Sequence, residues 1–349
     1  MQEASPRLTQ NNFHLIRLVC ALVVCTYHSY ELSRFPSLAW MPRIFSPNIA
    51  LNSFFIISGF LISLSYERTE GVLLFFKKRF FRIYPAYFLV VVGVAVLGFL
   101  LSTESFSAYF SRRWWMYLVA NLLLLNFLNP TLPGVFGGNR LPDVNGSLWT
   151  IKVEAFLYAT VPLLALVTRK VSPKAVSLAA YAVVTALDLL LNKASETTQS
   201  PIIYHLSREI TNPLSYFTGG ALIYQYLNVF ERYGRVFVIV GIFCMCLNEF
   251  WSLAVFVPLS LAVVVIFCSL FGFMGNFARF GDLSYGVYIL HFPIIQVLLQ
   301  YRCLETHPYG FLATVLCASL VGAKMLWHAI ELPCLERLHR SRTLARSIR

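Results

Sequence analysis

Apolar runs long enough to form membrane-spanning helices recur along the whole chain, separated by short polar segments. A helix needs about 20 residues to cross a hydrocarbon core of about 30 Å. The predicted spans are 14–30, 48–65, 84–101, 147–168, 172–191, 211–229, 235–250, 252–271, 284–301 and 310–330. The alternation with a period of two, typical of strands in a membrane barrel, is not seen. The pattern therefore predicts an all-α polytopic membrane protein, a helix bundle of about ten spans.

One further apolar stretch, "WWMYLVANLLLLNFL" at 114–128, is short for a span. A stretch of this length is more typical of a re-entrant or interfacial segment. If it does not cross, most Lys and Arg residues fall on one side of the membrane, the cytoplasmic side by the positive-inside bias. We therefore expect both termini in the cytoplasm. The expected organisation is a cytoplasmic segment 1–13, a single transmembrane domain 14–331 and a basic cytoplasmic tail 332–349.

Composition agrees with this interpretation and argues against a nucleic-acid partner and against a zinc site or disulfide framework. The chain is 58% hydrophobic and 13% charged, whereas a soluble domain carries roughly 25% charged residues. The net charge of +12 would suit a nucleic-acid partner, but the basic residues cluster at the ends of spans, where topology explains them. Most of the eight cysteines lie in apolar runs without the spacing of a zinc site or a disulfide framework. We expect no nucleic acid and no metal.

Ionisable residues inside spans are the first functional candidates, because they are costly in a bilayer. In the first span, read as retained rather than as a signal peptide, Arg17 and His28 are 11 residues apart. They share one helix face, about 17 Å apart along the axis. A histidine near a helix end also suits the wet interface, so spacing alone leaves both interpretations open.

The fourth span begins "NGSLWTIKVEAFLY" and carries Ser147, Glu154 and Tyr158 in one helical stripe. A carboxylate two turns into the bilayer needs a partner, and His28 is expected at a compatible depth. A carboxylate hydrogen-bonded to an imidazole orients the ring for general-base catalysis.

Two other spans carry polar residues. The second contains Asn52 and Ser58, although small residues there also suit close helix packing. In the ninth, "GDLSYGVYILHFPI", Tyr288 and His291 share a face, and Pro293 interrupts the helix hydrogen bonds beside them.

The segment "FFKKRFFRIYP" precedes the third span, which is expected to start at Pro85. Arg79 and Arg82 are three residues apart and share a face of any helix there. Guanidinium groups suit phosphate, so this segment and Lys78 predict a cytoplasmic anionic ligand, although topology alone also accounts for a basic loop.

Taken in order, "RLVCALVVCTYH", "FFIISGFLI", "KKRFFRIYP", "GSLWTIKVEAFLY", "LSYGVYILHFP" and "IELP" resemble the acyltransferase-3 family of integral membrane acyltransferases, in its stand-alone form without an appended extracytoplasmic hydrolase-like domain. The resemblance covers nearly the whole chain. It implies transfer of an acyl group, most often acetyl from acetyl-CoA, to a hydroxyl of a cell-surface glycan or its lipid-linked precursor. It also implies the inner membrane of a bacterium.

The resemblance implies that His28 is essential and that Arg17, Arg79, Arg82 and Glu154 take part. We expect His28 to act as general base or as an acyl relay, and Glu154 to orient it. Arg17, Lys78, Arg79 and Arg82 would bind acyl-CoA. The candidates for contacting the acceptor or the oxyanion are Asn52, Ser58, Ser147, Trp149, Tyr158, Tyr288 and His291.

The rival function is a transporter or exporter of a glycan or lipid, which ten spans with intramembrane charges would also suit. Against it, the two halves of the chain show no matching pair of broken helices, the usual sign of a transport site. A sensor or scaffold is disfavoured because every expected polar residue is present. The acceptor, the acyl chain length and the oligomeric state stay open.

Overall fold

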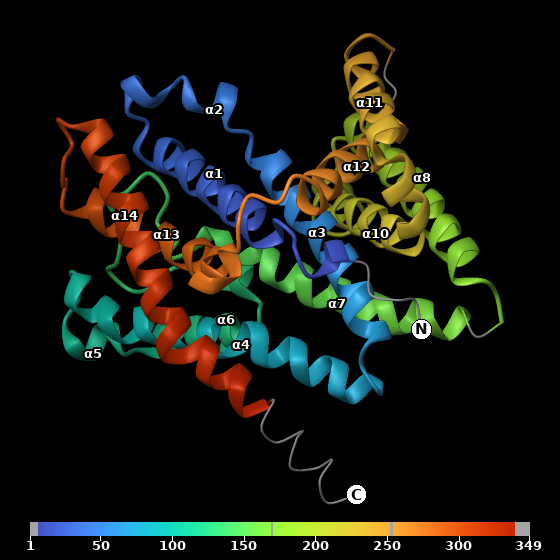
Figure 1. Cartoon of the computed structure of the whole chain (residues 1–349). Helices are drawn as coiled ribbons and strands as arrows, with labels where there is room; N and C mark the ends of the chain where they lie inside the picture. The colour runs from blue at the N-terminus through green and yellow to red at the C-terminus, as the bar shows by residue number, and fades with distance from the viewer. Residues whose placement is uncertain (1–5, 169, 252–253, 339–349) are drawn as a thin grey trace, which may run out of the picture. The chain divides into compact units, whose positions relative to one another are not determined.

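The computed structural model describes residues 6–168, 170–251 and 254–338 (Figure 1). Residues 1–5 of the predicted N-terminal segment and 339–349 of the predicted tail lie outside this part. The helices are α1 Phe13–Ser33, α2 Met41–Ile44, α3 Pro47–Glu67, α4 Val72–Leu97, α5 Phe106–Tyr109, α6 Arg112–Leu122, α7 Trp149–Val167, α8 Pro173–Thr198, α9 Pro201–Leu206, α10 Asn212–Gln225, α11 Leu227–Trp251, α12 Val257–Leu270, α13 Leu283–Gln300 and α14 Pro308–Leu326. The residues described contain no strand, which confirms the all-α prediction.

Each of the ten predicted spans corresponds to a helix. Seven helical segments in the described residues are long and apolar enough to cross a membrane: Phe13–Ser33, Pro47–Glu67, Val72–Leu101, Gly146–Val167, Pro173–Thr198, Leu283–Gln300 and Pro308–Leu338. The other three predicted spans correspond to α10, α11 and α12. Two of these are shorter, with 14 residues each in α10 and α12, and α11 carries charged residues at its start. The chain is a polytopic helix bundle with about ten spans.

The third span begins earlier than predicted. Helix α4 starts at Val72, and Pro85, expected to open the span, lies inside the helix. A proline lacks the backbone N–H that an interior position donates, so it weakens a helix at one turn. The residues on both sides of Pro85 are nevertheless helical, so α4 continues through that turn. The basic segment is therefore helical, as the face-sharing of Arg79 and Arg82 requires.

The stretch 114–128 does not form a span. Helix α6 has 11 residues, about 16 Å of helix, and a short 3₁₀ turn at Asn126–Leu128 follows it. Trp114 and Tyr117 are buried, whereas Trp115 and Val119 are exposed. One apolar face is thus left outside the protein, as in helices that lie in a membrane interface.

The fold divides into two compact units, each described by itself. The first unit comprises Met1–Arg17, Asn48–Phe75 and Val153–Phe277; the second comprises Leu18–Pro47, Phe76–Lys152 and Ala278–Arg349. Within the first unit, α10 packs against both α8 and α12, and α11 packs against α12. Within the second unit, α13 packs against α14.

Two glycines let helices α3 and α10 of the first unit approach at backbone distance. A Cβ atom added to Gly59 would lie 1.9 Å from the carbonyl oxygen of Phe217. A Cβ added to Gly220 would lie 2.0 Å from the carbonyl oxygen of Ile56. The contact is reciprocal, and small residues at a helix interface permit this approach. The close helix packing that the sequence allowed for small residues of the second span is confirmed.

We expect Gly59→Ala and Gly220→Ala each to lower stability by at least about 1–3 kcal/mol, because an added methyl group meets backbone that has no rotamer to change. Thermal unfolding of the purified protein in detergent measures the effect. Gly93→Ala is the matched control, since a Cβ at Gly93 meets no atom within 4 Å. Equal melting temperatures for all three variants would contradict the close approach.

Candidate functional site

The centre of the candidate site is a pair of histidines in the second unit. His28 lies on α1, the unbroken helix that also carries Arg17, as the sequence predicted. Its Nδ1 atom is 2.8 Å from Nε2 of His291 on α13. His291 is fully buried, at 0% exposed, whereas His28 is partly exposed. The predicted catalytic residue therefore has an imidazole as its nearest polar partner.

Pro293 interrupts the hydrogen bonding of α13 close to His291. Its missing N–H leaves the carbonyl oxygen of Ile289 without the usual helical donor. The side chain of Asn145 donates to that oxygen at 2.8 Å. The predicted polar cluster beside the proline is thus present, and a loop residue completes the hydrogen bonding that the helix lacks.

Two of the predicted oxyanion candidates, Ser147 and Tyr288, lie at this junction. The Ser147 hydroxyl lies 2.7 Å from Oδ1 of Asn145 and 3.2 Å from the carbonyl oxygen of Tyr288. Thr150 donates to the Tyr288 hydroxyl at 2.8 Å. Trp149 is the first residue of α7. The Ser147 proton is committed to groups that hold the loop on α13, so its role as an oxyanion donor stays a prediction.

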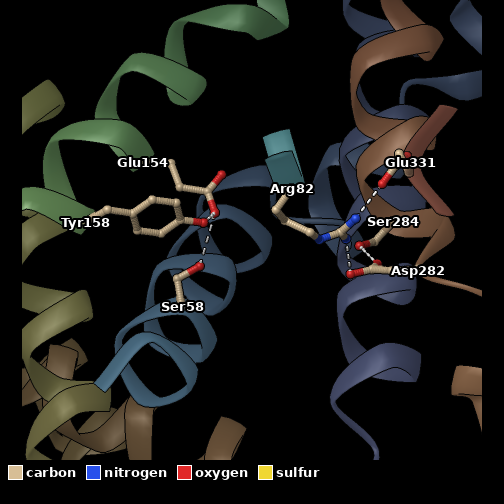
Figure 2. A network of polar contacts seen from close by, with 7 residues as sticks. All are labelled: Ser58, Arg82, Glu154, Tyr158, Asp282, Ser284 and Glu331. Carbon is tan, nitrogen blue, oxygen red and sulfur yellow. Dashed lines mark hydrogen bonds and ion pairs between the residues drawn. The ribbon is translucent and has the colours of Figure 1, made fainter. Parts of the chain in front are cut away.

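Glu154 has a polar cluster of its own in the first unit. The Tyr158 hydroxyl, one turn along α7, donates to the Glu154 carboxylate, and Ser58 of α3 lies 3.5 Å from the same oxygen (Figure 2). Asn52 of α3 lies beside Tyr216 of α10. The sequence placed Tyr158 on the stripe of Glu154, and this contact confirms it.

The predicted pairing of His28 with Glu154 joins residues of the two separate units and stays a prediction. The structure gives each of them a different partner within its own unit. Arg17 belongs to the first unit with Glu154, and its predicted contact with acyl-CoA is likewise untested.

Arg82 of the basic segment is bound to two carboxylates of the second unit. Its guanidinium donates one N–H to Asp282, just before α13, and another to Glu331, in the π-helical turn after α14 (Figure 2). Ser284 donates to the other oxygen of Asp282. Both carboxylates are buried, with 4% and 1% of each side chain exposed. Lys78 and Arg79 lie on the preceding turn of α4 and are partly exposed.

The Pro/Gly/Asn-rich loop before α7, 129–148, is ordered against α13. Gln296 of α13 donates to the backbone carbonyl oxygens of Leu141 and Asp143, at 2.7 and 2.6 Å. Arg140 forms an ion pair with Glu31, one turn beyond His28 on α1, at 2.8 Å. Burial raises the pKa of the Asp143 carboxyl. The loop thus binds to the two helices that carry the histidine pair.

Asp188 of α8 is a buried carboxylate that was not among the candidates predicted from the sequence. It accepts hydrogen bonds from Ser207 at 3.0 Å and from Thr211 at 2.6 Å, both in a π-helical turn before α10. A single acidic residue inside the apolar run "VVTALDLLL" was the available signal. No group of three or more His, Cys, Asp or Glu side chains suited to a metal ion occurs in the described residues.

Comparison with known proteins identifies the family of this chain. The family model described as "Acyltransferase domain", of acyltransferase type 3, matches residues 10–327. The O-acetyl transferase of Shigella phage Sf6 is 26% identical over 345 residues, covering 92% of this chain and 95% of the phage protein. Acyltransferase MdmB of Streptomyces mycarofaciens is 24% identical over 332 residues, covering 85% and 83%.

A third relative, nodulation protein 10 of Rhizobium leguminosarum bv. viciae, is 34% identical over 179 residues. That match spans less than half of either protein, 46% of each. No solved structure matches the chain significantly. The family match covers nearly all of the helix bundle, including His28, Glu154 and the basic segment of α4. The chain therefore belongs to the acyltransferase-3 family of integral membrane acyltransferases.

Proposed function

We propose that this protein is a membrane O-acyltransferase. It moves an acyl group, in the simplest case acetyl, from acyl-CoA to a hydroxyl of a cell-surface glycan or a lipid-linked glycan precursor. The observation that carries the proposal is the histidine pair, in which His28 is partly exposed and, among the described residues, only its Nδ1 atom is hydrogen-bonded. The family and the relatives named as O-acetyl transferase and acyltransferase support the reaction type.

His28 acts as the general base. Its free nitrogen takes the proton of the acceptor hydroxyl while the hydroxyl oxygen attacks the thioester carbonyl. The carbon–sulfur bond then breaks, and the CoA thiolate receives the proton from the His28 imidazolium. The products are an ester on the acceptor and free CoA thiol. Apolar surroundings keep water from competing with the hydroxyl for the thioester.

Lys78 and Arg79 bind the phosphates of acyl-CoA at the cytoplasmic end of α4, because paired cations on one helix turn suit a phosphate cluster. Arg17 is a further ligand of the donor. Arg82, the fourth basic residue predicted for this role, already has two carboxylate partners. In this proposal Arg82 joins α4 to Asp282 and Glu331 and does not bind the donor.

The donor enters from the cytoplasm and the glycan hydroxyl approaches from the opposite side of the inner membrane, with both chain termini cytoplasmic. The distribution of Lys and Arg along the sequence supports this orientation. Glu154, with Tyr158 and Ser58, forms a polar group inside the membrane in addition to the histidine pair. A carboxylate is costly in the bilayer, which supports a role for Glu154 in the transfer.

The test is acyl transfer by the purified protein in lipid nanodiscs. With acetyl-CoA labelled on the acetyl group and a lipid-linked oligosaccharide, we expect label in the lipid extract in an ester that mild base hydrolyses. Acetyl-CoA should also raise the melting temperature. A transporter predicts neither result, so a protein that binds no acyl-CoA across a range of donors would contradict the proposal.

A further inference from the structure

The two histidine rings meet edge to edge. Their planes differ by only 7° and their centroids are 5.1 Å apart, while Nδ1 of His28 and Nε2 of His291 are 2.8 Å apart. Nearly coplanar rings with this short nitrogen distance share an in-plane N–H···N hydrogen bond, because the nitrogen lone pairs and N–H bonds lie in the ring planes. One nitrogen must donate and the other must accept.

Val287 fixes the direction of this hydrogen bond. Its carbonyl oxygen lies 3.1 Å from Nδ1 of His291, and a carbonyl oxygen can only accept. Nδ1 of His291 therefore carries a proton. In a neutral imidazole the other nitrogen is then an acceptor, so Nε2 of His291 accepts from Nδ1 of His28.

The neutral form of His291 follows from its surroundings. The ring is fully buried, and among the described residues no carboxylate bonds to either histidine. Tyr288 and Phe292 pack against His291, at centroid distances of 5.8 and 6.4 Å. A buried cation without a counter-ion would be expensive, so both rings are neutral at rest.

We infer that His291 is a positioning residue that holds His28 in the Nδ1–H tautomer, so that Nε2 of His28 presents its lone pair to the acceptor hydroxyl. From the sequence, Glu154 was predicted to orient His28. The inference rests on the proposed function of His28. When Nε2 takes the proton, the Nδ1–H bond to His291 stays in place and stabilises the imidazolium.

The packing around the pair leaves little freedom. Phe292 meets the His28 ring edge-on, with centroids 5.5 Å apart. A Cβ added to Gly146 would lie 2.9 Å from the Phe292 ring, so the loop before α7 holds that ring in turn. In the described residues, Nε2 of His28 makes no hydrogen bond. It is the one nitrogen of the pair left for chemistry.

Two isosteric variants of His291 separate positioning from packing. In His291→Gln the side-chain amide reaches the place of Nε2 and can accept from His28, whereas in His291→Asn it reaches only the place of Nδ1. We expect His291→Asn to lower kcat by about 10²-fold and His291→Gln by less than about tenfold. KM for acetyl-CoA should change in neither, because His291 does not contact the donor. Both should unfold at similar temperatures.

Equal losses of kcat in the two variants, or no loss in His291→Asn, would overturn the inference. If neither variant folds, ¹⁵N spectra of histidine-labelled wild-type protein decide the matter. We expect His28, assigned by its absence from His28→Ala, to show a protonated Nδ1 and an unprotonated Nε2; the reverse pattern would refute the tautomer. Full transfer by His28→Ala would instead refute the proposed role of His28 as the base, and so the two failures are distinguishable.

Discussion

Replacing His28 by alanine is expected to lower kcat for acyl transfer by about 10²- to 10⁴-fold, the contribution of a positioned general base. Without the ring, no group takes the hydroxyl proton as the oxygen attacks the thioester. The loss should appear in kcat and leave the affinity for acetyl-CoA unchanged, since the predicted phosphate ligands lie elsewhere, on α4. The measurement is transfer of labelled acetyl by purified protein in nanodiscs.

His205→Ala is the matched control for this loss. His205 lies in α9 with 62% of its side chain exposed, beside Glu209. Removing it deletes an exposed imidazole that is not part of the histidine pair, so transfer should stay at the wild-type rate. His28→Ala protein that keeps more than about a tenth of the wild-type kcat would contradict general-base catalysis at this position. Unchanged melting temperatures of the two variants would show that the loss of kcat is not caused by unfolding.

An acyl-histidine relay predicts the same kinetic loss for His28→Ala, and a trapping experiment separates it from direct transfer. Wild-type protein incubated with labelled acetyl-CoA and no acceptor would retain label on the protein only if His28 first attacks the thioester itself. In direct transfer the label stays on CoA until a hydroxyl is supplied. The unprotonated Nε2 is competent for either step.

Local patterns in the sequence predicted most of the fold. Each apolar run became a helix, because residues close in sequence decide where a helix can cross a membrane. The contact of Glu154 with Tyr158 was also predictable, since residues four apart in a helix face the same way. The prediction that the third span starts at Pro85 was wrong. A proline often opens a helix, and only the residues on both sides of it decide whether the helix continues through it.

The partners of the functional residues could not be predicted in the same way. His28 and His291 are 263 residues apart in sequence, and nothing in either span specifies which faces of α1 and α13 meet. Helical spacing shows which residues share a face but not what packs against that face. The sequence favoured a carboxylate as the partner of the His28 imidazole, whereas in the structure the ring of His291 is hydrogen-bonded to it.

The partners of Arg82 could not be predicted from helical spacing either. The spacing of Arg79 and Arg82 predicted a phosphate site, because arginines on one helix face suit an anion. The structure supplies two anions from the protein itself, Asp282 and Glu331, separated from Arg82 by 200 and 249 residues. Tertiary packing therefore decides whether a guanidinium binds a ligand or holds helices together.

Arg82→Met is expected to destabilise the protein by about 3–5 kcal/mol, the usual cost of removing one partner from a buried ion pair. The substitution leaves the carboxylates of Asp282 and Glu331 buried without their cation, and the links between α4, the start of α13 and the turn after α14 are lost. Thermal unfolding in detergent measures the loss. Lys77→Met, at an exposed position of the same helix, is the matched control and should leave the melting temperature unchanged.

The neutral triple variant Arg82→Met, Asp282→Asn, Glu331→Gln separates structure from ligand binding. Replacing a whole buried ion cluster by uncharged groups is often neutral or stabilising, so most of the lost stability should return. If Arg82 serves the fold alone, KM for acetyl-CoA in the triple variant should equal the wild-type value, because Lys78 and Arg79 still bind the phosphates. A triple variant with wild-type stability and a KM raised about tenfold or more would make Arg82 a phosphate ligand after all. The two carboxylates would then have to release the guanidinium whenever the donor binds.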